Sequence, residues 1–91
     1  MEINDYKIIF TDTAVKRLKS FSYKEKVKIF QKIEDLGKNP LANKNVKKLI
    51  NFDISYRLRI GDYRVLFERN DEMKIIEIID IRYRKESYRR N

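Results

Sequence analysis

The stretch that decides the fold is Tyr56-Arg57-Leu58-Arg59-Ile60-Gly61-Asp62-Tyr63-Arg64-Val65-Leu66-Phe67. It predicts two short strands joined at a tight turn, because Gly accepts a positive φ and Asp can bond its own backbone. Side chains alternate between the two faces of a strand. We therefore expect the alternating apolar and aromatic positions on one face, toward the core, and three arginines on the other: Arg57, Arg59 and Arg64.

Three guanidinium groups on one rigid face are suited to binding phosphate, because each offers a planar fork of donors. The alternative is a solvated surface, since exposed strands use charge to prevent aggregation. The net charge of +8 favours polyanions or an acidic protein partner. Eight of the nine arginines lie in residues 44–91, whereas residues 1–43 are basic mainly through lysine. This segregation favours the phosphate site.

The residues before the hairpin predict a strand and two helices. β-branched and aromatic residues at 6–10 are typical of a strand. Thr11 is the predicted N-cap of a helix that ends near Lys19, and a capping box at Ser22 starts a second helix from about residue 23 to 36. In the second helix we expect one apolar stripe, and we expect Gly37 to cap its C-terminus. The stripe comprises Val27, Ile29, Phe30, Ile33 and Leu36.

The remaining chain predicts an irregular segment and a last strand. Residues 41–53 are expected to form an irregular basic loop, in which Lys47 and Lys48 either contact a nucleic-acid backbone phosphate or only keep the loop soluble. Residues 74–81 carry isoleucine on both faces, which predicts a central strand. The fold class is therefore α+β, with two N-terminal helices packed on a small, mostly antiparallel sheet in the order β-α-α-β-β-β. We expect one domain spanning residues 1–91.

Composition excludes several classes of function. No cysteine or histidine is present, so a disulfide framework, a thiolate site and a histidine acid–base pair are excluded, and we expect no metal or cofactor. No apolar run approaches the roughly 18 residues that span a bilayer, and the N-terminus does not resemble a signal peptide. We therefore expect a cytoplasmic protein that does not bind membranes.

Two motifs carry a family resemblance over nearly the whole chain. The run from Tyr56 to Val65, together with Arg82-Tyr83-Arg84-Lys85-Glu86-Ser87-Tyr88, resembles the RelE/ParE toxin superfamily of prokaryotic toxin–antitoxin systems. The resemblance implies the RelE-like fold. It also implies a metal-independent, ribosome-dependent endoribonuclease that cuts messenger RNA in the A site. In that reaction the 2′-OH attacks the adjacent phosphate and leaves a 2′,3′-cyclic phosphate and a 5′-OH.

The resemblance also implies roles for individual residues. Arg57 and Arg59 match basic residues that stabilise charge or assist proton removal, and Arg64 matches the phosphate-stabilising arginine. Arg82 matches a basic residue near the leaving 5′ oxygen, and Tyr88 matches a tyrosine that stacks on a base. Arginines interleave with tyrosines in the last ten residues, which favours RNA contact there. The further candidates for RNA binding in this segment are Arg84, Lys85 and Arg89.

One departure from the family concerns the general base. Some relatives have lysine where this chain has Arg57 and Arg59, and arginine effectively cannot lose its proton. Tyr88, Lys48 or the ribosomal RNA would then accept the proton, unless the enzyme relies on positioning and charge alone. Two other functions stay open: a ParE-like inhibitor of DNA gyrase, and a non-catalytic RNA-binding module. The implied partners are a cognate antitoxin, the ribosome and messenger RNA, with operator DNA bound only through the antitoxin complex.

Overall fold

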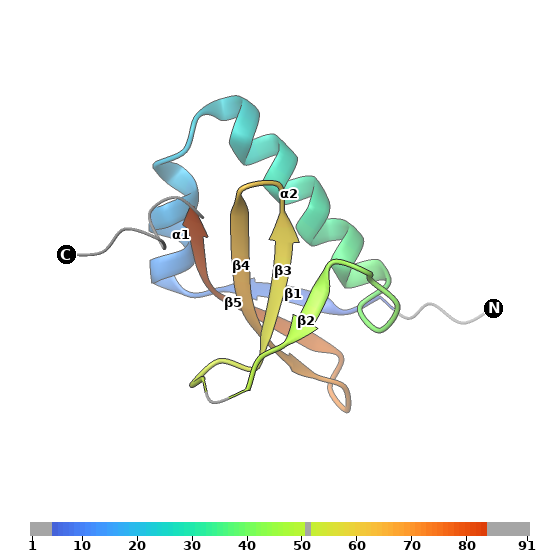
Figure 1. Ribbon diagram of the computed structural model, residues 1–91. Coiled ribbons are helices and arrows are strands. Elements are labelled where there is room, and N and C mark those ends of the chain that lie inside the picture. The colour runs from blue at the N-terminus through green and yellow to red at the C-terminus, as the bar shows by residue number, and fades with distance from the viewer. Residues whose placement is uncertain (1–4, 51, 84–91) are drawn as a thin grey trace.

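The computed structural model describes residues 5–50 and 52–83, which form two helices and five strands (Figure 1). The elements follow in the order β1 (Lys7–Phe10), α1 (Asp12–Lys19), α2 (Tyr23–Lys38), β2 (Val46–Lys48), β3 (Tyr56–Ile60), β4 (Tyr63–Asn70) and β5 (Ile75–Tyr83). The strands make one sheet in the order β1-β5-β4-β3-β2. β1 runs parallel to β5, and the other neighbours are antiparallel. The predicted α+β class with helices on a mostly antiparallel sheet is confirmed.

Strand β2 was not expected, because residues 41–53 read as irregular. Val46–Lys48 pair with β3 at the edge of the sheet, where Lys47 lies opposite Arg57. Three residues with two adjacent lysines show no alternation that could predict a strand. The strand forms because β3 offers an unpaired edge, which is a tertiary effect.

Thr11 turns the chain from the other edge of the sheet into α1. Its backbone N–H donates to the carbonyl of Ile78 at 3.0 Å, and its hydroxyl donates to the carbonyl of Ile79 at 2.7 Å. The same hydroxyl accepts from the N–H of Ala14 at 3.1 Å, as an N-cap does. The predicted cap is confirmed, and α1 lies beside the part of β5 that β1 does not cover (Figure 1).

Helix α2 begins at the predicted cap but ends later than expected. Ser22 accepts from the N–H of Glu25 at 3.3 Å, whereas the C-cap is Asn39 and Gly37 lies inside the helix. The prediction of Gly37 as the cap is wrong. A Cβ added at Gly37 would lie 3.1 Å from Cδ1 of Ile8. The carbonyl of Gly37 accepts a hydrogen bond from the N–H of Tyr6 at 2.8 Å. The glycine therefore allows the chain around β1 to approach the helix closely.

The apolar stripe of α2 is narrower than predicted. Ile29, Ile33 and Leu36 are fully buried, whereas Val27 and Phe30 are 37% and 45% exposed. At 3.6 residues per turn, each step of three residues falls about 60° short of a full turn. Residues spaced three apart therefore move progressively around the helix, and only Ile29, Ile33 and Leu36 stay on the face toward the sheet.

The core is formed between that helix face and one face of the sheet. The buried sheet side chains are Leu58, Ile60, Val65, Phe67, Ile76, Ile78 and Ile81. We call the opposite face of the sheet the open face. No helix in the described ranges is long and apolar enough to cross a membrane.

A β-bulge decides which residues of β5 face the core. Leu66 pairs with Asp80 and Phe67 pairs with Ile78, so Ile79 has no partner in β4. The extra residue interrupts the alternation of side chains. Without it, Asp80 would follow Ile76 and Ile78 into the core. With it, Ile81 is buried in the core instead, and Asp80 and Arg82 belong to the open face.

Tyr6 and Asp71 form a polar contact at the end of the core. The Tyr6 hydroxyl donates to Oδ1 of Asp71 at 2.9 Å, and Nε of Arg69 lies 2.8 Å from the same oxygen. The hydrogen bond from Tyr6, followed by Arg69, lowers the pKa of Asp71 below its ordinary value of 3.8. Burial, followed by the contact with Asp71, raises the pKa of Tyr6 above 10.0. Both shifts stabilise the fold at neutral pH.

The substitution Tyr6→Phe should lower the melting temperature at neutral pH, because Asp71 loses its hydroxyl donor. A lowered carboxyl pKa gives stability that is lost as pH falls, and a raised phenol pKa gives stability that is lost as pH rises. The difference from wild type should therefore be constant between about pH 5 and 9 and shrink below about pH 4 and above about pH 10. Thermal denaturation across this range measures it. Tyr23→Phe is the control, because Tyr23 is 80% exposed, and a difference that did not change with pH would contradict this explanation.

Candidate active site

The strand register collects five basic side chains on the open face in two adjacent rows. In one row Arg59 lies opposite Arg64, which lies opposite Arg82. In the next row Lys47 lies opposite Arg57, which is followed by Leu66 and Asp80. Directly opposed residues on antiparallel strands have Cβ atoms about 4.5–5.5 Å apart. We call Lys47, Arg57, Arg59, Arg64 and Arg82 the arginine face.

A row of three arginines does not stabilise a sheet. Like charges directly opposite one another on neighbouring strands are destabilising, by an amount on the order of 0.2–1 kcal/mol for each pair. Natural proteins depart from the rules of stability chiefly at functional sites. Because the members are guanidinium groups on rigid strands, the ligand that this row fits is an anion with several acceptor oxygens.

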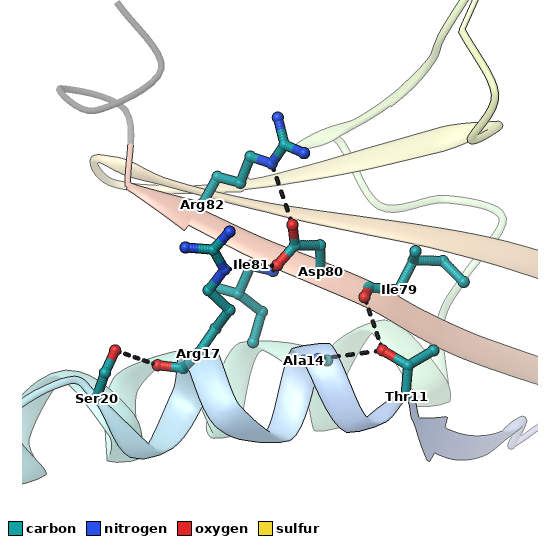
Figure 2. Close-up of polar contacts among 8 residues, drawn as sticks. All are labelled: Thr11, Ala14, Arg17, Ser20, Ile79, Asp80, Ile81 and Arg82. Atoms are coloured by element: carbon teal, nitrogen blue, oxygen red, sulfur yellow. Dashed lines mark hydrogen bonds and ion pairs between the residues drawn. The ribbon is translucent and has the colours of Figure 1, made fainter. Parts of the chain in front are cut away.

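Asp80 holds one end of this row in place (Figure 2). Its side chain is 8% exposed, and its Oδ2 accepts from Nε of Arg82 at 3.1 Å. Its Oδ1 accepts from Nε of Arg17 at 3.1 Å and from the backbone N–H of Ile81 at 2.8 Å. Asp80 contacts Arg82 through Nε, and Figure 2 shows the terminal nitrogens of Arg82 extending away from the carboxylate. The carboxylate therefore orients Arg82 without covering the end of its guanidinium.

A cavity of about 300 Å³ adjoins the arginine face. Arg57, Arg64 and Arg82 line it, and its other lining residues are Leu49, Phe52, Asp53, Ile54 and Leu66. Nε of Arg57 is buried and has no hydrogen-bond partner among the described residues. A buried donor without a partner costs on the order of 1–3 kcal/mol, so packing alone does not favour an arginine at this position.

The other residues predicted from sequence fall in different places. Arg59 is exposed on the arginine face but does not line the cavity. Lys48 lies opposite Tyr56, whose ring stacks on the buried Phe67, so its register position belongs to the core side of the sheet. The sequence analysis treated Lys47 and Lys48 as one pair of candidates, but side chains alternate along β2, so the two lysines lie on opposite faces of the sheet. Four predicted residues lie outside the described ranges: Arg84, Lys85, Tyr88 and Arg89.

Three residues of this site were missed by sequence reasoning. Asp80 could have been found, because an acid within the isoleucine run of β5 signals a buried polar contact. Phe52 and Asp53 gave no such signal, since they lie in a segment without periodicity. Among residues 5–50 and 52–83, no group of three or more His, Cys, Asp or Glu side chains could hold a metal ion.

A family model places the chain among known proteins. The model for the ParE toxin of the type II toxin–antitoxin system parDE matches residues 8–88. This chain belongs to the RelE/ParE superfamily of toxins. No curated protein matches its sequence.

Solved structures of RelE proteins share the fold of this RelE/ParE toxin. One match is a chain of the archaeal RelE–RelB complex from Pyrococcus horikoshii OT3, with 28% sequence identity and a TM-score of 0.75. The match covers 88% of this chain and 96% of the matched chain. A chain of the RelB–RelE complex from Methanococcus jannaschii is 28% identical with a TM-score of 0.69, and the match covers 88% of this chain and 94% of the matched chain. A chain of the RelBE2 complex from Mycobacterium tuberculosis is 24% identical with a TM-score of 0.78, and the match covers 91% of this chain and 95% of the matched chain. The likeness therefore extends over almost the entire toxin.

Proposed function

We propose that this RelE/ParE toxin is a ribosome-dependent endoribonuclease that cleaves messenger RNA in the A site. The observation that carries the proposal is the cavity on whose lining the three arginines Arg57, Arg64 and Arg82 meet. The 2′-OH of the RNA attacks the adjacent phosphate, the P–O5′ bond breaks, and a 2′,3′-cyclic phosphate and a 5′-OH result. Negative charge builds on the pentavalent phosphorus, and fixed guanidinium groups stabilise it.

The arginines divide this work by position. Arg64 lies in the middle of the row between Arg59 and Arg82, so it is assigned to the phosphate oxygens. Arg57, in the next row and also on the cavity lining, is assigned to the same group. Arg82, which Asp80 holds at the end of the row, is assigned to the leaving 5′ oxygen. Tyr88, by its resemblance to the family motif, stacks on a base.

Asp53 is the proton acceptor in this mechanism. Arginine effectively cannot accept a proton at neutral pH, and Asp53 is the one carboxylate among the described residues that line the cavity. The proton of the 2′-OH moves to the Asp53 carboxylate as the new O–P bond forms, and the leaving 5′ oxygen takes a proton from water. Asp53 then releases its proton to solvent. Because Asp53 is exposed, the ribosome is assigned the task of positioning the RNA, and free RNA is cleaved weakly.

The name of the family model supports a second candidate function. A model for ParE toxins matches residues 8–88, and the alternative is a ParE-like inhibitor of DNA gyrase. Guanidinium groups beside a cavity are suited to stabilising the charge that develops in RNA cleavage, whereas inhibition of a protein target gives no reason for them to meet there. For this reason we place the endoribonuclease first.

The arginine face requires a partner that silences it, and we assign this role to a cognate acidic antitoxin in the cytoplasm. The P. horikoshii and M. jannaschii relatives were both solved as RelB–RelE complexes, and the net charge of +8 favours an acidic segment. Operator DNA would be bound only through that complex. The product of the neighbouring gene should co-purify with the toxin at moderate salt. Elution of the toxin alone under these conditions would contradict the assignment.

Cleavage should be measured in a translation reaction with purified ribosomes and a defined messenger, with the 5′ ends mapped by primer extension. The wild type should cut at the A-site codon. Arg64→Ala should lower the rate by about 10²–10³, because one fixed donor to the developing charge is lost, and Tyr88→Ala should also lower it. Lys24→Ala on α2 is the control. Intact messenger, together with inhibition in a gyrase supercoiling assay, would replace this proposal with the second candidate, and intact messenger that still binds would indicate a non-catalytic module.

Asp53→Asn should lower the single-turnover cleavage rate by about 10²–10⁴, the usual contribution of general base catalysis. Asp53→Glu should keep part of the rate, because the carboxylate remains. An Asn variant with the wild-type rate would exclude Asp53 as the proton acceptor.

A further inference from the structure

Part of the cavity lining is apolar, and phosphate chemistry alone does not explain it. Leu49, Phe52 and Ile54 form this apolar wall on the connection between β2 and β3, and Leu66 lines the cavity from β4. Phe52 is 70% exposed, and the nearby Ile50 is 77% exposed. The side chains of the described core are buried without these residues, so the fold does not account for an exposed aromatic ring in the lining of a cavity that three arginines share.

The combination of surfaces defines the chemistry of the ligand. The arginine side of the cavity fits an anion, and the exposed ring fits a flat, apolar surface within reach of that anion. A nucleotide has both parts in one molecule, because its phosphate and its base are joined through one sugar. Aromatic side chains beside a positively charged groove are the usual means by which proteins hold single-stranded nucleic acid.

We propose that Phe52 is a stacking platform for a nucleobase of the RNA whose phosphate lies on Arg57 and Arg64. This inference rests on the proposed function in taking RNA as the ligand, and it assigns to Phe52 a positioning role in the substrate site. The stacked base fixes the sugar on the cavity side, which brings the 2′-OH toward the carboxylate of the neighbouring Asp53.

Binding can be measured without cleavage or ribosomes. The probes are a fluorescent 2′-O-methyl RNA nonamer, which lacks the attacking hydroxyl, and a nonamer of the same backbone with abasic sugars. Affinities at fixed low salt are compared for the wild type, Phe52→Ala and Phe52→Trp. Phe30→Ala on α2 is the matched control, because Phe30 is also a partly exposed phenylalanine, at 45%.

Phe52→Ala should weaken binding of the base-bearing RNA by about 5- to 150-fold, the range expected for loss of one stacked base. It should leave binding of the abasic RNA unchanged. Phe52→Trp should keep the affinity, and its fluorescence should be quenched on binding. Equal affinities of the wild type and Phe52→Ala for the base-bearing RNA would overturn the proposal, as would an equal loss for both probes. Binding of the antitoxin that depends on Phe52, with RNA binding unchanged, would make the wall a protein interface and would also overturn it.

Failure of this inference can be told apart from failure of the proposed function. If wild-type toxin cuts messenger at the A site and Phe52→Ala cuts with unchanged kcat and KM, the endoribonuclease stands and the platform is excluded. If messenger stays intact but the base-bearing RNA binds through Phe52, the platform stands and the endoribonuclease is excluded. The two claims therefore have independent readouts.

Discussion

The extra residue at Ile79 in β5 is the constraint on which the site depends. A strand with strict alternation would bury Asp80 and Arg82 in the apolar core, where an isolated charge is too costly to persist. The bulge moves both residues to the open face and returns Ile81 to the core. One irregularity in the register therefore lets a single run of isoleucines complete the core on one side and the arginine face on the other. Bulges next to functional sites commonly re-aim a side chain in this way.

The carboxylate of Asp80 joins that bulge to the helical layer. Because it is almost fully buried, it needs partners for both of its oxygens, and these come from α1 and from the next open-face position of its own strand. Thr11 places α1 within reach, since its hydrogen bonds to β5 fix where the helix starts. The position of Arg82 is therefore tied to the first helix, to the bulge and to the edge strand. A site made of mutually repelling guanidinium groups requires such support from outside the row.

The sequence predicted most of the fold and the arginines that the candidate site brings together, but not the other residues of the cavity, and the reason differs from element to element. The hairpin, its two faces and the caps at Thr11 and Ser22 are local features, so local patterns predict them. Strand β2 and the role of Gly37 depend on neighbours distant in sequence, and no local pattern records them. Phe52 and Asp53 belong to the candidate site only because the connection between β2 and β3 lines the same cavity as Leu66 and the arginines. Whether the protein cleaves RNA or inhibits gyrase depends on which target it recognises and on the reaction at its site. The alternation of side chains along a strand carries no information on either.

The most direct test is whether the arginine face binds an anion as one site. Nitrogen-15 NMR of the arginine Nε groups during a titration with inorganic pyrophosphate measures this for each residue separately. We expect the Nε resonances of Arg57, Arg64 and Arg82 to move together with one dissociation constant. Arg69, which is paired with Asp71 away from the cavity, should stay in place. Small parallel shifts of all the arginines would mean that the charge is diffuse and that no anion site exists on this face.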